Sequence, residues 1–539
     1  MPESISDNVR VFTEKNPAEP LDFSVIVDSL CEGCTDSSNS DKVRLQRRFG
    51  YFSQFFASSG VKSVVVEERY VDRDYFQDFA NYYSLCFAEY QKFCKRCHLF
   101  TRPYSKDDIE RIVVNCNADE VGELKKSYLG FFVFRPLPVV VFGRTCLNPN
   151  PNLNPRSSKI HRFLATVKIP VNFFGLELEV NSTPFQEQDS TVSACATSAL
   201  WTSFQITRRL FGHLPYSPSA ITRLATEHSG PSTGNILPNH GLFREEMIHA
   251  IGRVGLGSLC ETADPRNGMD YASVKILSAA YLSIGLPVVL IVDMVRCNGC
   301  SQVYIGRHAI VVCGYRFRET CPMPRPYRGL PSKYDNIEAI YCVDDQVGPY
   351  CQLTGIPHKQ GRPYMWHTEW SQDAHEKICC RVTDMLVPLY HKIRVSHDEI
   401  FAKAAEFFLP IRGLLVANGD VDNIFNSAIM DIRLVKSNAF KRYVRNEKCF
   451  PLNVKSKAMF YCFPKYMWLV FACIGDIPLV LFAVDATDVA HGVHVVFSVK
   501  YDDFLDSSVK FLAENNKLYM ANSFTHSYLN DCFCCREKR

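Results

Sequence analysis

The stretch 186–201 constrains this chain most, because it carries one cysteine from a polar loop into an amphipathic run. It reads QEQDSTVSACATSALW, with the cysteine at position 195. From Cys195 onward, apolar or small side chains recur at helical spacing until Gly212. The stretch therefore predicts a helix that begins at Cys195. The recurring positions are Ala196, Ala199, Leu200, Phe204, Ile206 and Leu210.

A cysteine at the start of a helix is placed for nucleophilic chemistry. The unpaired N–H groups and the positive end of the helix dipole stabilise a thiolate there, and the thiolate is the attacking species. The chain has 23 cysteines, so position alone does not assign a role. A catalytic cysteine also needs a base and a group that orients the base, brought close by the fold.

Candidates for both groups follow Cys195 in the chain. His308 lies in a strand-like run, 306–315, that ends in Gly314-Tyr315. Asp344 and Asp345 come directly after a second strand-like run, 339–343. Side chains alternate between the two faces of a strand, which would place the two aspartates on opposite faces if the strand extends that far. Asp344 is favoured as the first polar residue after the strand, and Asp345 stays open.

This order of motifs resembles the papain-like cysteine peptidases. A glutamine precedes the cysteine, the cysteine opens a helix, a histidine begins a strand ending in Gly-Tyr, and an aspartate follows the next strand. The details are most similar to the bacterial double-glycine leader peptidases, over about residues 180–360. The resemblance implies an α+β fold with a papain-like core, in which the helix bearing the nucleophile packs on an antiparallel sheet.

The resemblance also implies the role of each residue. Cys195 would be the nucleophile, His308 the general base and then acid, and Asp344 or Asp345 the carboxylate that orients the imidazole. Gln188 would donate its side-chain amide to the oxyanion beside the Cys195 N–H. Family spacing between the glutamine and the cysteine varies, so Gln186 is an alternative. Alanines at 194 and 196 replace the family's glycine and aromatic neighbours.

Length and patterning predict three regions. At 539 residues the chain has room for several domains. We expect an N-terminal α+β region over 1–180, a papain-like peptidase domain over 181–394 and a C-terminal α+β region over 395–539. Within them, hydrophobic periodicity predicts helices over 76–95, 271–284 and 425–447, a buried strand over 287–293, and a hairpin of strands 467–474 and 479–484.

Composition bears on partners and location. A net charge of +3 makes no case for nucleic acid or an acidic membrane surface, so we expect neither as a partner. No signal peptide and no apolar run of membrane-spanning length is visible, which favours a cytoplasmic protein with reduced thiols. Three CxxC pairs leave a structural zinc site open, although no cofactor or metal is expected at the catalytic residues. They are Cys31/Cys34, Cys94/Cys97 and Cys297/Cys300.

The sequence thus favours a cysteine peptidase that hydrolyses a peptide or isopeptide bond in a protein or peptide substrate through an acyl-thioester. Two alternatives use the same residues differently. Acyl transfer of the transglutaminase type needs the same constellation, and a catalytically silent scaffold would bind a partner protein through the flanking regions. The distance between the Cys, His and Asp side chains separates the enzymes from the scaffold.

Overall fold

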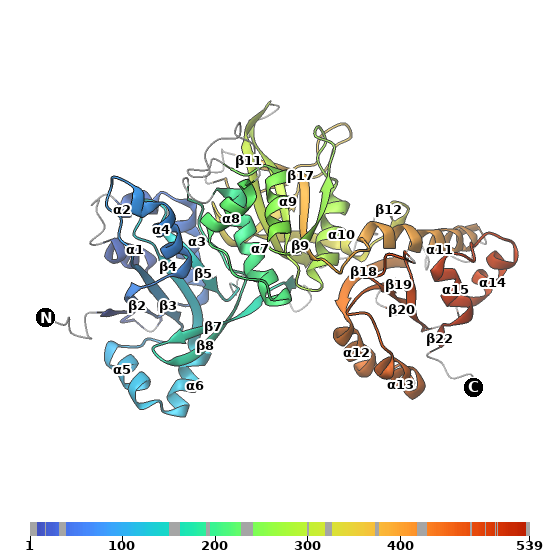
Figure 1. Ribbon diagram of the computed structural model, residues 1–539, viewed down its shortest axis with the longest axis horizontal. Helices are drawn as coiled ribbons and strands as arrows, with labels where there is room; N and C mark the ends of the chain where they lie inside the picture. The colour runs from blue at the N-terminus through green and yellow to red at the C-terminus, as the bar shows by residue number, and fades with distance from the viewer. Residues whose placement is uncertain are drawn as a thin grey trace. The chain divides into compact units, whose positions relative to one another are not determined.

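The structure is a computed structural model of the chain (Figure 1). It describes residues 8–16, 18–31, 39–149, 162–189, 194–227, 241–298, 301–318, 326–371, 377–417, 428–474, 477–490, 492–501, 503 and 505–534. Helices alternate with several antiparallel sheets, so the predicted α+β class is confirmed. Among the described residues, no helix combines the length and the apolarity that crossing a bilayer requires.

The chain forms two compact units, and each is built from segments that are not contiguous in sequence. Unit 1 contains Met1–Met269, Pro287–Tyr315 and Ala339–Pro388. Unit 2 contains Asp270–Leu286, Arg316–Glu338 and Leu389–Arg539. The division into three regions at 180 and 394 remains a sequence-based prediction.

A five-stranded antiparallel sheet organises the N-terminal part of unit 1, in the order β1-β2-β3-β4-β5. On β2, Val64 and Val66 enter one apolar core and Val65 enters another, as expected for a strand buried on both faces. The strands are β1 Val9–Thr13, β2 Ser63–Tyr70, β3 Cys94–Phe100, β4 Tyr128–Phe134 and β5 Phe142–Leu147.

Helices cover both faces of this sheet. Phe23 of α1 and Phe52 of α3 share the core of Val64, whereas Ile109 of α5 and Leu124 of α6 share the core of Val65. The second core also receives the β-hairpin β7–β8. These elements are α1 Phe23–Cys31, α2 Asn39–Arg44, α3 Arg47–Ser59, α4 Arg73–Asn81, α5 Lys106–Asn115, α6 Ala118–Ser127, β7 Val167–Phe173 and β8 Leu176–Ser182.

A second sheet of unit 1 closes on itself. Strand β10 pairs with β11 on one side and with β17 on the other, so the strands β10-β11-β14-β15-β16-β17 form a ring. Strand β9 extends it beside β17, and β6 pairs with β11. The strands are β6 Arg162–Leu164, β9 Leu256–Thr262, β10 Val288–Asn298, β11 Ser301–Phe317, β14 Ile337–Asp344, β15 Gly348–Gly355, β16 Trp366–His367 and β17 Lys377–Tyr390.

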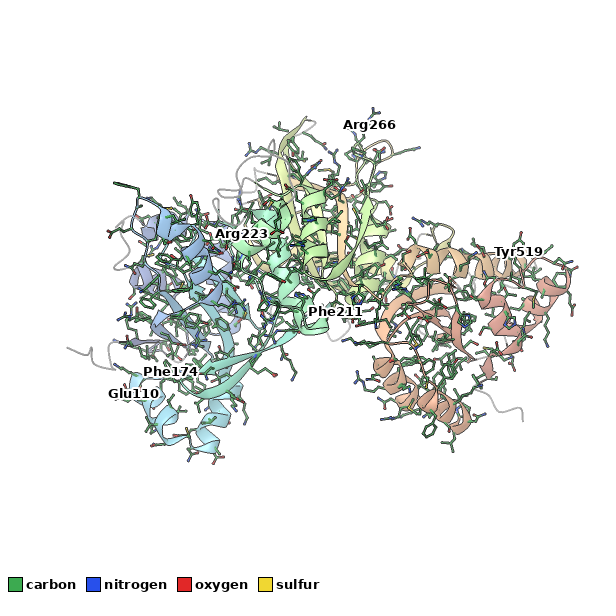
Figure 2. The ribbon with its side chains drawn as sticks, in the orientation of Figure 1. Glu110, Phe174, Phe211, Arg223, Arg266 and Tyr519 are labelled. Carbon is green, nitrogen blue, oxygen red and sulfur yellow. The ribbon has the colours of Figure 1, made fainter. Side chains whose placement is uncertain are left out.

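Helix α7, which begins at Cys195, joins the two sheets of unit 1 through one core. Leu200 and Phe204 of α7 belong to the same apolar cluster as Phe52 of the N-terminal part and Val289 of the closed sheet. Residues before and after position 180 therefore bury each other's apolar surface. The helices beside the closed sheet are α7 Cys195–Phe211, α8 Pro218–Thr226 and α9 Arg244–Arg253; Phe211 and Arg223 are labelled in Figure 2.

Unit 2 is built on a five-stranded sheet in the order β18-β19-β20-β21-β22, antiparallel except for the last pair. The predicted hairpin is confirmed as β19 and β20. The strands are β18 Ala428–Lys436, β19 Tyr466–Ile474, β20 Ile477–Asp485, β21 Val495–Lys500 and β22 Phe533–Cys534, with a short ladder of β12 Pro326–Tyr327 and β13 Leu330–Pro331.

Helix α10, Tyr271–Leu282, confirms the helix predicted over 271–284 and packs within unit 2. The Tyr281 ring lies 5.5 Å from Trp468 of β19, and the Ser283 hydroxyl donates to the Leu434 carbonyl of β18 at 2.7 Å. The other helices of unit 2 are α11 His397–Ala417, α12 Ser437–Asn446, α13 Leu452–Phe460, α14 Asp506–Glu514 and α15 Ser523–Asn530.

Candidate active site

Helix α7 begins at Cys195 and is followed by Gly212 in the left-handed conformation, as the sequence predicts. Its N-cap is Ala194, which offers no side-chain oxygen to the N–H groups of the first turn. These groups have no acceptor within the helix, so they and the helix dipole can stabilise negative charge on a half-buried Cys195 or on a group bound beside it.

The N-terminal sheet and α4 anchor this helix. The Trp201 indole donates to an Asp74 carboxylate oxygen at 2.8 Å, and the Arg144 guanidinium pairs with the same carboxylate at 2.6 Å. Burial alone would raise the pKa of Asp74, but Arg144 and Arg73 outweigh burial and lower it. The carboxylate therefore stays charged and fixes one face of α7.

His308 is delivered by β11, opposite Val292 of β10, and is buried. Its Nε2 lies 2.9 Å from Oδ1 of Asp344, and the Cys195 thiol is near enough to the ring to act on its pKa. Burial alone would lower the pKa of His308. The Asp344 carboxylate, the Cys195 contact and Asp345 outweigh burial and raise the pKa well above its usual value.

Asp344, the last residue of β14, accepts three hydrogen bonds. Besides His308, Oδ1 accepts from the Gln346 backbone N–H at 2.9 Å, and Oδ2 accepts from the Trp370 indole at 2.7 Å. Burial would raise the pKa of Asp344, but the His308 charge and these hydrogen bonds lower it. Asp344 is thus a fixed anion that orients the imidazole and stabilises its protonated form.

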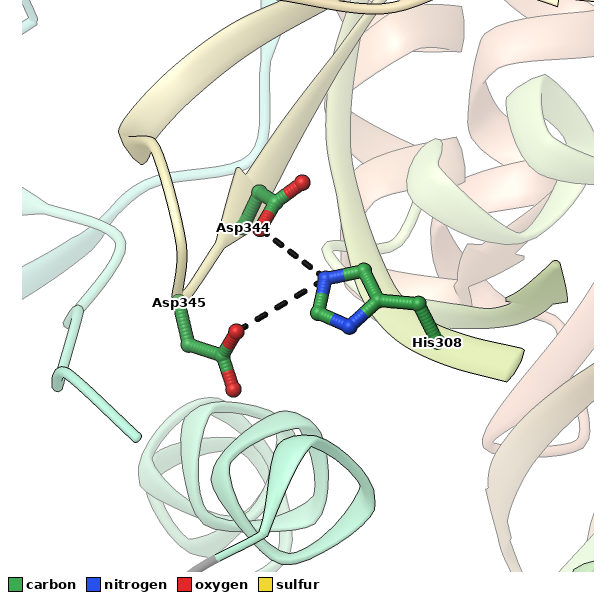
Figure 3. Close-up of side chains that lie close together, drawn as sticks. All are labelled: His308, Asp344 and Asp345. Carbon is green, nitrogen blue, oxygen red and sulfur yellow. Dashed lines mark hydrogen bonds and ion pairs between the residues drawn. The ribbon is translucent and has the colours of Figure 1, made fainter. Parts of the chain in front are cut away.

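Asp345 approaches the same ring nitrogen without hydrogen bonding to it. Its Oδ1 lies 3.6 Å from Nε2 of His308, and neither carboxylate oxygen has a hydrogen-bond partner in the described part of the chain. Burial, reinforced by Asp344 and Glu187 and opposed by His308 and Arg48, raises the pKa of Asp345 to about 7. In Figure 3 both carboxylates face one ring nitrogen, and the other ring nitrogen points away from them.

The two glutamines named as oxyanion donors lie in different surroundings. Gln186 is buried and lines a cavity of about 10 Å³ together with Ser198, Thr202 and Asp345. Gln188 is half-buried. The segment 190–193, between them and Cys195, lies outside the described residues. Both glutamines therefore remain candidates for the oxyanion.

Trp370 belongs to the site although the sequence did not single it out. Its ring packs edge-on against the His308 ring, with centroids 4.9 Å apart, and its indole N–H donates to the Asp344 carboxylate at 2.7 Å. The Arg47 guanidinium of α3 lies 5.1 Å from the Trp370 ring centroid and donates to the Trp370 carbonyl at 2.8 Å. The available signal was chemical, because the N–H of a partly buried indole usually finds an acceptor.

One group of described side chains has the spacing of a metal site. A nitrogen of His308 and carboxylate oxygens of Asp344 and Asp345 lie within 4.8 Å of one another, a ligand set that suits a divalent cation. Hydrogen bonds already account for Nε2 and for both oxygens of Asp344. Only Asp345 keeps both oxygens for a further ligand.

The CxxC pairs do not assemble a zinc site from the described residues. Cys94 and Cys97 lie three residues apart on β3 and enter opposite cores, so they cannot bind one ion. Cys34 and Cys300 lie outside the described residues. Zinc binding by the pairs Cys31/Cys34 and Cys297/Cys300 therefore stays a sequence-based prediction.

No protein-family model matches the chain, and no curated protein matches it. Among solved structures, a chain titled "Structure of EndoMS-dsDNA2 complex" is similar over 51% of this chain and 86% of its own length, with 10% sequence identity and a TM-score of 0.12. A TM-score this low supports no argument about fold or function.

One expectation is corrected at this point. The net charge led us to exclude a nucleic-acid partner, and that exclusion does not stand beside a similar chain whose title names a DNA complex. Net charge is a sum over the whole chain and does not exclude a local basic surface. We therefore withdraw the exclusion, and the weak similarity gives no positive case for DNA binding.

Proposed function

We propose that this chain is a cysteine peptidase that hydrolyses a peptide or isopeptide bond, with Cys195 as nucleophile. One observation carries the proposal: the buried His308 ring binds the Asp344 carboxylate through Nε2 at 2.9 Å, and the Cys195 thiol stands near enough to the same ring to help raise its pKa. A nucleophile, a base and an orienting carboxylate in this order form the constellation of acyl-transfer enzymes. A scaffold has no need of all three contacts.

The packing of α7 supports a papain-like core as part of the proposal. The helix bearing Cys195 lies in one apolar cluster with Val289 of β10, Val311 of β11 and Val343 of β14. It thus packs on the strands that deliver the histidine and the aspartate. A helix on an antiparallel sheet, with the nucleophile at its N-terminus, is the arrangement that the family resemblance implies.

In the first half of the reaction, His308 takes the thiol proton and Cys195 Sγ attacks the scissile carbonyl carbon. The oxyanion that forms would be met by the Cys195 N–H, at the uncapped start of α7, and by the amide of Gln186 or Gln188. As the intermediate collapses, the C–N bond breaks, His308 gives its proton to the leaving amine, and an acyl-thioester remains.

In the second half, a water molecule gives a proton to His308 and attacks the thioester carbonyl. Collapse of this intermediate breaks the C–S bond, releases the carboxylic acid and returns the proton to the thiolate. Asp344 keeps the imidazole oriented and stabilises the imidazolium in both halves. An amine in place of the water would give acyl transfer, and the mass of the product distinguishes the two reactions.

The state of the cysteines is consistent with a cytoplasmic location, which we keep as part of the proposal. The nineteen cysteines that the structure describes are all free thiols, as expected in a reducing compartment.

Alkylation by iodoacetamide tests the proposal without a known substrate. Cys195 should react at pH 6, where an ordinary thiol with a pKa near 8.5 is almost fully protonated. The exposed Cys116, Cys449 and Cys462 serve as reference thiols in the same sample, and mass spectrometry locates the label. His308→Ala should bring Cys195 down to the reference rate. If Cys195 in the wild type reacts at pH 6 no faster than the references, the peptidase proposal is refuted.

A further inference from the structure

The start of helix α3, in the N-terminal part of unit 1, touches the candidate active site through two consecutive arginines. Arg47 and Arg48 are the first two residues of the helix, whose N-cap Gln46 makes no side-chain capping bond. Cations are unfavourable at a helix N-terminus because the macrodipole is positive there. Because two arginines at this end of α3 reduce the stability of the helix, we expect them to make contacts elsewhere in the fold that compensate for the loss.

Arg48 is buried, with 4% of its surface exposed, and reaches the turn that follows Asp344. One terminal nitrogen donates to the Asp345 carbonyl at 3.3 Å and to the Gln346 side-chain oxygen at 3.1 Å. Gln346 is the residue whose backbone N–H supports Asp344 at 2.9 Å. The Arg48 guanidinium thus stabilises the turn at Asp345-Gln346, and this turn fixes the Asp344 carboxylate.

Arg48 also pairs with Glu187, which is fully buried. Glu187 stands between the two glutamines proposed for the oxyanion, and its second carboxylate oxygen accepts from the Phe142 backbone N–H of β5 at 2.8 Å. Burial raises the pKa of Glu187, against the opposing charges of Arg48 and Arg135. The charged pair is favourable only while its geometry is kept.

We propose that Arg48 is a positioning residue of the active site, which ties the carboxylate turn to the glutamine segment, with Arg47 supporting Trp370. The inference rests on the proposed function and deepens it. It makes the N-terminal part of unit 1 a component of the catalytic apparatus. A planar guanidinium suits this task because several N–H donors diverge in fixed directions, whereas a lysine ammonium is a compact point charge.

The test uses the pH dependence of Cys195 alkylation in the full-length chain. Arg48→Lys keeps the charge beside Glu187 and so keeps the fold, but it cannot bridge the turn and the glutamine segment at once. With Asp344 less firmly held, the imidazolium of His308 is less stabilised and less thiolate exists at low pH. We expect Cys195 to react about tenfold more slowly than in the wild type at pH 6, and at an equal rate at pH 10, where an ordinary thiol is ionised.

A second variant guards against loss of folding. Arg48→Met with Glu187→Met replaces the buried pair by apolar side chains, a change that folded proteins often tolerate, and it should show the same loss at pH 6. The control is Arg96→Met with Glu67→Met, which removes an Arg–Glu pair between β3 and β2 together with the contact of Glu67 with the buried His98, and should leave the ratio of the two rates unchanged. Circular dichroism confirms that each variant is folded.

The outcomes separate the two proposals. A general loosening of the structure would raise alkylation at both pH values and would not lower the pH 6 rate alone. If the wild-type Cys195 is activated but Arg48→Lys and the double variant keep the wild-type ratio, the positioning role of Arg48 is wrong and the peptidase proposal stands. If the wild-type Cys195 is not activated at pH 6, the peptidase proposal fails and the role of Arg48 fails with it.

Discussion

Replacing Asp345 by asparagine should stabilise the protein, and the gain should grow with pH. Asp345 is buried without a hydrogen-bond partner in the described part of the chain, and its pKa is raised from 3.8 to about 7. Between these values the folded chain keeps the proton that the unfolded chain releases. Stability that the protonated acid provides is therefore lost as pH rises through this window.

The size of the effect follows from the two pKa values. Each pH unit between them lowers the free energy of unfolding by about 1.4 kcal/mol. The Asp345 carboxyl group therefore lowers it by roughly 4 kcal/mol above pH 7 and by roughly 1.7 kcal/mol at pH 5. An asparagine does not ionise, and its amide can reach the polar groups of the small cavity, which include Gln186 and Ser198. The increase in the free energy of unfolding caused by Asp345→Asn should thus be about 2.5 kcal/mol larger at pH 8 than at pH 5.

Urea unfolding of wild type and variant at the two pH values measures this difference. Asp344→Asn is the matched control, because its carboxylate has a lowered pKa and contributes stability above its unfolded pKa that is lost as pH falls. That variant should be destabilised at pH 8. A gain for Asp345→Asn that is equal at pH 5 and pH 8, or a loss at pH 8, would refute the reasoning that Asp345 is held as a neutral acid.

Three further predictions concern the site and its frame. Trp370→Phe removes the indole donor to Asp344, so it should cost about 1.5–3 kcal/mol in urea unfolding and slow Cys195 alkylation at pH 6; unchanged values would show that the indole bond is dispensable. Dialysis against a chelator should leave that alkylation unchanged, and a loss restored by added zinc would instead assign a metal to the His–Asp–Asp group. Gly348→Ala should lower the free energy of unfolding by about 1–3 kcal/mol, since φ is +150° and the new Cβ would lie 2.6 Å from the Tyr51 ring. Gly306→Ala is the control, because it has open space around it, and its free energy of unfolding should stay within about 1 kcal/mol of the wild-type value.

Local sequence signals located the elements that carry the candidate chemistry. The helix starting at Cys195, the strand of His308 and the strand ending at Asp344 were all visible in short windows. Each has a clear hydrophobic period and a boundary at a glycine or a polar residue. The preference for Asp344 came from its place after the strand, and the hydrogen-bond geometry agrees with that preference.

Tertiary context overrode the sequence signal elsewhere. The aromatic residues from Phe76 to Tyr90 predicted a helix through residue 95, but α4 ends at Asn81 and β3 begins at Cys94. The helix predicted over 425–447 is in its described part a strand, Ala428–Lys436, and then a helix, Ser437–Asn446. The antiparallel pairing of β18 with β19 stabilises residues 428–436 as a strand, although the local hydrophobic pattern favours a helix there.

The long-range parts of the site were beyond prediction from the sequence. Arg48 lies far from Glu187 and Gln346 in the chain, and two arginines at a helix start do not reveal which distant side chains they will meet. Closure of the second sheet likewise depends on β10 finding two partners at once. Such features follow from the packing of distant segments, which periodicity within one segment does not encode.

The placement of α10 has a consequence for the order of synthesis. This helix belongs to unit 2 and packs against β18 and β19, yet it leaves the ribosome well before those strands do. Its side chains from Val274 to Leu282 are all buried in the finished protein. A nascent chain must therefore carry an unsatisfied apolar helix until most of the C-terminal sheet has been made. A premature stop codon after the closed sheet would release that helix permanently exposed, so chaperones and proteases should recognise such fragments as misfolded even though Cys195, His308 and Asp344 are all present.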